Sequence, residues 1–217
     1  MAVPASNISL QAVRGDLDLS TAGSMTERKV RERVAKYSGD VRLSDFANSV
    51  VGQPHTPTGV LGDPPKNRHT FTWARSGSTN DNFYSFPGDD WLRLEARNHF
   101  TGQVLDAWTE ARFAGQISAS GNYALEGRLR TYIAFCPSQV AVVSGSSGYM
   151  AGTTNLDFYK FYNKTTTGSY TEHTVSEVIS LSSWRPYITI IVYSMNLEQA
   201  YIGNAPNEFK GIRLRKS

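Results

Sequence analysis

Beyond residue 69, apolar and polar residues alternate with a period of two, and this alternation limits the fold more than any other feature of the chain. A β-strand places successive side chains on opposite faces of a sheet, so the alternation predicts strands with one buried face. It is clearest in residues 123–135. There the expected core face holds Leu125, Leu129, Ile133 and Phe135, and the expected solvent face holds Glu126, Arg128 and Arg130.

Further strand-like segments follow one another at short intervals, separated by clusters of glycine and serine. Residues 186–193 are apolar on both faces, which is typical of a central strand. The other candidates are residues 91–97, 139–144, 155–162, 170–181 and 209–215. About seven to nine strands with no helix between them predict a mainly β fold, an antiparallel β-sandwich or jelly roll, over residues 69–217.

The chain before this region has a different pattern. Residues 53–68 contain four prolines and predict an extended Pro/Gly-rich linker. Within residues 1–52, Val30 and Val34 are spaced as on one face of a helix, and Gly39 stands where a helix would end. Ser44 is placed to cap a short turn that leads to Phe46. We expect a small helical segment whose core is too small to fold alone, so that it needs a partner surface.

No catalytic or cofactor site is recognisable in the sequence. The four histidines lack neighbours at metal-ligand spacing, and no nucleophile elbow or phosphate-binding loop is present. Cys136 is the only cysteine, which excludes a disulfide within the chain, and its apolar surroundings predict a buried small hydrophobe. We therefore predict a non-enzymatic protein with no metal and no cofactor.

Charge and hydropathy exclude two classes of partner. The net charge is only +3 at pH 7 and is spread along the chain, which argues against nucleic acid. The densest charge cluster, residues 28–33, is read as a solvated helix face or as a docking face for an acidic neighbour. The longest apolar stretch, residues 187–195, is too short to cross a membrane, so no membrane insertion is expected. The N-terminus lacks the layout of a secretory signal, which predicts a protein made in a cytoplasm.

Aromatic residues are concentrated in residues 158–162. A strand here would carry rings on both faces, so only half of them can belong to the core. We expect Tyr159, Phe161 and Tyr162 to contact another subunit or, as the alternative, to stack on the sugar rings of a host-surface glycan.

Residues 3–46 contain a series of short motifs: Val3-Pro4-Ala5-Ser6, Ile8-Ser9-Leu10, Val13-Arg14, Leu17-Asp18-Leu19-Ser20, Val30-Arg31 and Ser38-Gly39-Asp40-Val41-Arg42-Leu43-Ser44-Asp45-Phe46. This series resembles a short module at the start of many tailed-bacteriophage virion proteins of the tail-fibre, baseplate or minor structural type. The family pattern is roughly P-x-S-G-x-I-S-L-x-D-I/V-R, closed by S-G-x-I-x-L-S-D-F. The chain departs from it at Asn7, where glycine is usual, and at Gln11-Ala12, where Ser-Asp or Asn-Asp is usual.

In its relatives this module precedes unrelated C-terminal domains, so the resemblance implies a place in the particle rather than an activity. It implies a structural protein of the tail, baseplate, fibre or neck, localised to the virion, assembled in the bacterial host cytoplasm with other virion proteins, and forming a homo-oligomer, either a trimer or a hexamer. A glycan-binding module at a fibre tip and a capsid-decorating protein are the alternatives. The residues expected to make the attachment are Ile8, Leu10, Val30, Val34, Leu43 and Phe46.

Overall fold

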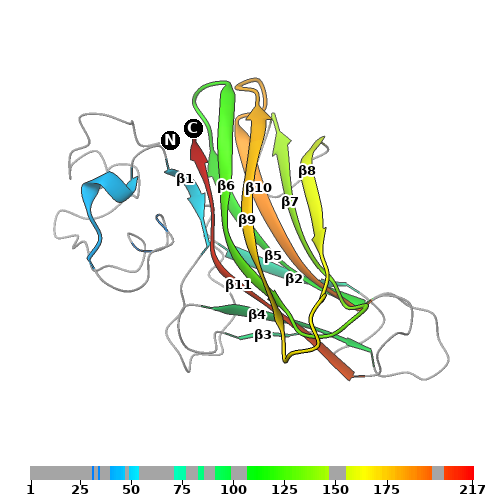
Figure 1. Cartoon of the computed structure of the whole chain (residues 1–217). Coiled ribbons are helices and arrows are strands. Elements are labelled where there is room, and N and C mark those ends of the chain that lie inside the picture. The colour runs from blue at the N-terminus through cyan, green and yellow to red at the C-terminus, as the bar shows by residue number, and fades with distance from the viewer. Residues whose placement is uncertain are drawn as a thin grey trace.

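The computed structural model describes residues 31, 34, 40–46, 49–53, 71–76, 83–85, 91–98, 107–146, 155–196 and 203–217. Within these residues two antiparallel sheets lie face to face (Figure 1). Sheet A has the order β3 (Phe83–Ser85), β4 (Leu92–Asn98), β11 (Gly203–Lys216), β6 (Gly121–Thr131), β9 (Thr171–Leu181), and β1 (Ser49–Gly52) also pairs with β11. Sheet B has the order β2 (Phe71–Ser76), β5 (Ala107–Gln116), β10 (Tyr187–Asn196), β7 (Ser138–Gly145), β8 (Asn155–Tyr162). The prediction of a mainly β, sandwich-like fold is confirmed.

The core lies between the inner faces of the two sheets. Strand β6 contributes Leu125 and Leu129, which are completely buried, as the alternation predicted. Strand β10 lies between β5 and β7 and is buried on both faces, because Ile191 packs on the outer side with Ala141. The main core consists of inward side chains from β1, β4, β5, β6, β7, β8, β9, β10 and β11. Its stability rests on apolar burial, since the single cysteine is a free thiol.

The alternation fails at one end of the β6 run. Strand β6 ends at Thr131, and Phe135 lies in the following turn with its side chain 76% exposed, so its predicted place in the core is wrong. The backbone of Phe135 has a φ of 65°, which is the left-handed conformation that turns use and regular strands do not. The prediction for Cys136, next in the chain, is confirmed because that residue is buried.

Strand β11 contains a bulge where its pairing with β6 shifts register between Lys210 and Arg213. Gly211 in this bulge has a φ of 63°, which favours glycine. Opposite the bulge, a Cβ atom on Gly127 would lie 2.9 Å from the Cα of Ile212, so only glycine fits there. Two glycines therefore allow β11 to bend across β6.

The division of the chain into an attachment segment, a linker and a sandwich stays a prediction, with one correction. Residues 49–53 were assigned to the attachment segment and the linker, but β1 pairs with β11 and its Val50 and Val51 belong to the core. Gln53 is buried as well, and its side-chain amide donates a hydrogen bond of 3.0 Å to the carbonyl of Phe209. The residues of β1 alone give little indication of a strand, because the strand with which β1 pairs, β11, lies far away in the sequence.

Most of the N-terminal segment lies outside the described residues. Arg31 and Val34 have helical conformation, and the short 3-10 helix η1 (Leu43–Phe46) follows. The predicted cap at Ser44 is wrong, since Ser44 lies inside η1. The Asp45 carboxylate instead accepts a hydrogen bond of 2.8 Å from the backbone N–H of Arg42, just before the helix.

Candidate functional site

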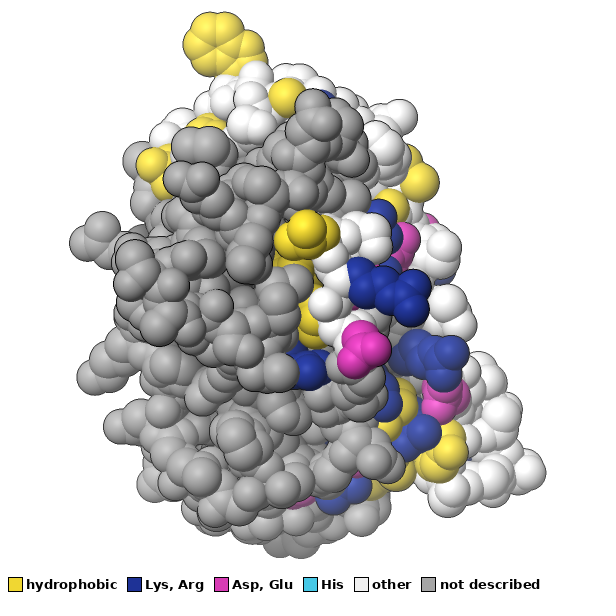
Figure 2. Space-filling model, turned by 90° about the vertical axis from the view of Figure 1, so that its left-hand side faces the viewer, with side chains coloured by type: hydrophobic (Ala, Val, Ile, Leu, Met, Phe, Trp, Pro, Cys, Tyr) yellow, Lys and Arg dark blue, Asp and Glu magenta, His cyan; other side chains and the backbone are white. Residues whose placement is uncertain are grey.

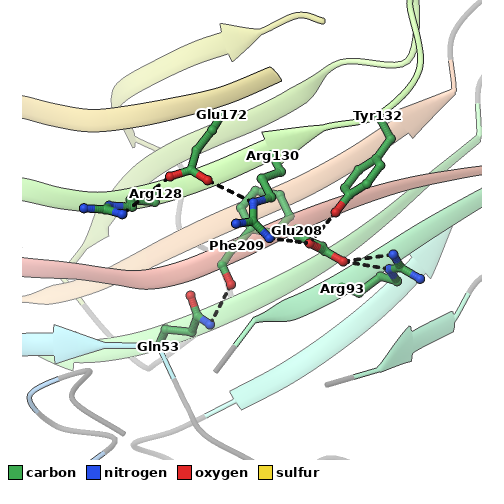
Figure 3. Close-up of polar contacts among 8 residues, drawn as sticks. All are labelled: Gln53, Arg93, Arg128, Arg130, Tyr132, Glu172, Glu208 and Phe209. Carbon is green, nitrogen blue, oxygen red and sulfur yellow. Dashed lines mark hydrogen bonds and ion pairs between the residues drawn. The ribbon is translucent and has the colours of Figure 1, made fainter. Parts of the chain in front are cut away.

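The outer face of sheet A carries a row of four charged side chains of alternating sign (Figure 3). The register places Arg93 of β4 opposite Glu208 of β11, Glu208 opposite Arg130 of β6, and Arg130 opposite Glu172 of β9. Side chains directly opposite one another on neighbouring strands are close enough to interact. We call these four residues the charged row.

Glu208 is the centre of the charged row and is buried. One carboxylate oxygen accepts hydrogen bonds from Arg93, at 3.0 Å from Nε and 2.9 Å from a terminal nitrogen. The other oxygen lies 2.6 Å from the hydroxyl of Tyr132 and 3.7 Å from Arg130. Burial and the hydrogen bond to Glu208 raise the pKa of Tyr132, so the phenol stays protonated and its O–H donates a hydrogen bond to the carboxylate.

Arg130 connects the charged row to a group of aromatic rings. Its guanidinium carbon lies 3.9 Å from the ring centroid of Trp91 and 4.6 Å from that of Tyr170. Its Nε donates a hydrogen bond of 3.0 Å to Glu172. Tyr170 also contacts Tyr132, with the ring centroids 5.6 Å apart. Cation–π stacking of this kind holds an arginine and its neighbouring rings in one arrangement.

This arrangement suits binding better than proton transfer. Glu208 and Glu172 are each held by arginine, so neither resembles a carboxylate prepared to act as a general acid or base. Among the described residues, no three His, Cys, Asp or Glu side chains gather as metal ligands. A side view of the molecule shows Lys and Arg side chains beside Asp and Glu side chains on the described surface (Figure 2). Within the charged row, each arginine is therefore paired with a carboxylate.

The aromatic segment predicted from the sequence forms β8, one of the two edge strands of sheet B. Tyr159 and Phe161 project from its outer face and are 57% and 45% exposed. Leu156 lies opposite Val143, whose side chain packs on the outer face of the sheet, and is exposed too. A bulge between Val142 and Val143 places Leu156 on the same outer face as Tyr159 and Phe161. We call Leu156, Tyr159 and Phe161 the β8 row.

Tyr162 has a different environment, and its predicted contact with a partner or glycan is wrong in this structure. Its side chain is buried in the main core, with its ring 5.4 Å from that of His173. Burial, with a smaller effect from Glu177, raises the pKa of Tyr162 to about 12. A residue in this position supports the fold rather than a contact surface.

The predicted attachment residues fall into three groups. Ile8, Leu10 and Val30 lie outside the described residues. Val34 and Phe46 are buried within this chain, so their side chains are not available at the surface of the folded monomer. Leu43 is partly exposed and remains available to a partner.

One exposed residue was not singled out by the sequence analysis. Trp184 lies in the turn between β9 and β10 and is 87% exposed. The turn is fixed by Ser120, whose hydroxyl accepts a hydrogen bond of 2.8 Å from the backbone N–H of Ser183. The cluster of two serines before the tryptophan and a proline shortly after it is a turn signal that could have marked this position.

No described helix is long and apolar enough to span a membrane.

No protein-family model and no curated protein sequence matches this chain. Among solved structures, a carbohydrate-binding module described as CBM4 has a TM-score of 0.46 at 11% identity, and the match covers 72% of this chain and 93% of that one. A cleaved adhesin domain of Lys-gingipain from Porphyromonas gingivalis has a TM-score of 0.43 at 12% identity, covering 67% and 90%.

The enzymatically active domain of tailspike protein 4 from bacteriophage CBA120 has a TM-score of 0.44 at 8% identity. That match covers 69% of this chain but only 20% of the tailspike chain. At these scores and identities the likenesses carry no argument about function. The fold class rests on the two antiparallel sheets themselves.

Proposed function

We propose that this chain is a non-enzymatic structural subunit of a tailed-phage particle, localised to the virion, which attaches through its N-terminal segment and packs its sandwich against another virion protein. The place in the particle is supported by the resemblance of residues 3–46 to the virion module. The observation that carries the packing role is the β8 row, three large hydrophobic side chains exposed side by side on an edge strand. An exposed hydrophobic edge strand is a site for association with another chain.

The geometry of the β8 row favours a protein partner over a sugar. The rings of Tyr159 and Phe161 are 6.2 Å apart and nearly perpendicular, at 83°. Rings at this angle do not form one flat surface on which a sugar could stack, whereas an edge-to-face pair packs well with further apolar side chains. Leu156 adds aliphatic surface of the same kind.

The experiment is to complement a phage lacking this gene with a tagged chain and to measure the chain in purified particles. We expect the wild-type chain to be present in the particles. The amount of the double variant Tyr159→Ala/Phe161→Ala in the particles should be about tenfold lower, which is the effect of losing a central aromatic contact. Val178→Ser, a change at an exposed apolar residue on sheet A, is the matched control and should be incorporated normally.

Absence of the wild-type chain from particles would refute the virion role. Normal incorporation of the double variant would refute packing through the β8 row and leave the virion role standing. Self-association as a trimer or hexamer is a separate part of the proposal, and light scattering of the purified chain over a range of concentrations tests it.

A further inference from the structure

Beside the charged row, the outer face of sheet A holds a pair of like charges. Lys210 of β11 lies opposite Arg128 of β6. The neighbouring pairs on the same two strands are Glu208 with Arg130 on one side and Arg213 with Glu126 on the other. Both neighbouring pairs therefore join opposite charges, and the pair between them joins two cations. Like charges placed directly opposite each other in a sheet are destabilising.

Among the described residues, contacts within the chain compensate this pair only in part. A terminal nitrogen of Arg128 is 3.5 Å from Glu172, but the other oxygen of that carboxylate is closer to Arg130, at 3.0 Å. The ammonium of Lys210 lies 5.7 Å from the ring centroid of Trp91. The side chain of Arg128 is 66% exposed. The charge of Arg128 is thus directed toward solvent beside the partly buried Lys210, and an anion from outside the chain would neutralise the pair.

Aromatic surface lies next to the same pair. Two residues further along β6, Arg130 stacks against the partly exposed ring of Tyr170. Positions two residues apart on a strand are separated by about 7 Å. A ligand with an anionic group at one end and a ring with apolar faces at the other would match this spacing, and an acidic sugar has both features.

We propose that the outer face of sheet A binds an acidic saccharide, with its carboxylate or sulfate between Arg128 and Lys210 and a sugar ring against Tyr170. Nucleic acid fits this face less well, because a phosphate backbone needs a line of uncompensated cations. Here the flanking Arg130 and Arg213 already hold carboxylates, at 3.0 Å and 2.9 Å. This binding role lies beyond the packing role of the β8 row and uses the opposite sheet, so the two can operate together.

The test measures binding of the purified full chain by isothermal titration calorimetry to four probes: oligogalacturonate, dextran sulfate, neutral dextran and a DNA duplex. We expect the chain to bind one or both acidic saccharides and not neutral dextran. The two acidic probes distinguish a carboxylate ligand from a sulfate ligand. Arg128→Gln and Lys210→Gln should each weaken binding about tenfold, the effect of losing one charge-assisted contact.

Two further variants and one stability measurement make the test specific. Arg185→Gln removes a positive charge from the turn after β9 and should leave the affinity within about twofold of wild type. Tyr170→Ala should weaken saccharide binding. Lys210→Gln should melt no lower than wild type, because it removes a like-charge pair, and so separates a binding effect from unfolding. The proposal would be overturned if the chain bound neither acidic saccharide, or if the Arg128 and Lys210 variants bound as tightly as wild type. Binding of DNA as tight as that of the acidic saccharide would overturn it as well.

Discussion

Replacing Gln53 with leucine should destabilise the sandwich by about 3 kcal/mol. The buried side chain of Gln53 donates to the carbonyl of Phe209 at 3.0 Å and accepts from the backbone N–H of Ile212 at 3.3 Å. Leucine keeps the apolar bulk but leaves both backbone groups without these bonds. A buried backbone group left unpaired costs about 1–3 kcal/mol, and two such groups give the expected loss.

Urea unfolding followed by tryptophan fluorescence measures this loss directly, and thermal unfolding should show a decrease of roughly 10 °C. Gln139→Leu, the same change at a half-exposed position on β7, is the control and should alter stability by less than about 0.5 kcal/mol. An unchanged urea midpoint for Gln53→Leu would refute the reasoning, because it would mean that residues 49–53 unfold separately from the sandwich.

Three further measurements test other parts of the structure. Glu208→Gln should lower the free energy of unfolding by about 2 kcal/mol in urea titrations, a value discounted because the side chains of its partners Arg93 and Arg130 are 31% and 24% exposed. An unchanged midpoint would contradict the central role of Glu208. Burial raises the pKa of the Cys136 thiol to about 12, so a thiol reagent near pH 8 should label the native protein far more slowly than the unfolded protein. Burial, together with Lys160, lowers the pKa of His173 below 6.5 despite a hydrogen bond to the backbone of Asn163. Its contribution to stability is then complete above about pH 6.5 and is lost as the pH falls through the folded-state pKa, and His173→Gln should flatten that dependence.

The strands of the core could be predicted because their signal is local. In β6 the buried residues Tyr123 and Leu125 alternate with the partly exposed Ala124 and Glu126, and this alternation is visible in the sequence. The rule stopped working where the strand ended, at Thr131, because nothing in the alternation of residues 123–135 marks the turn that exposes Phe135. Periodicity predicts which residues lie on the same face of a strand, but it does not predict where the strand ends.

The surfaces depend on contacts between distant segments and were harder to predict. The sequence placed Arg128 and Arg130 on a solvent face correctly, yet their partners Glu172, Glu208 and Lys210 come from other strands whose register no local pattern reveals. In β8 the segment was correct, and Tyr159 and Tyr162 face opposite sides as simple alternation requires, but the bulge opposite Val142 and Val143 places Leu156 on the same face as Tyr159. A shift of one residue exchanges the two faces of a strand, so such a bulge reverses any prediction based on simple alternation.

The bulge in β11 connects the N-terminal part of the chain to the proposed saccharide site. Gln53 bonds to Phe209 and Ile212, the residues that enclose Lys210 and Gly211, and its own backbone N–H donates to the carbonyl of Ile212 at 2.8 Å. Gly127 supports the same bulge from the side of β6. The position of Lys210 opposite Arg128 therefore depends on contacts made by residue 53, and Gln53→Leu should weaken binding of the acidic saccharide even under conditions in which the sandwich remains folded. Unchanged affinity in a folded Gln53→Leu protein would show that the bulge keeps its shape without this contact.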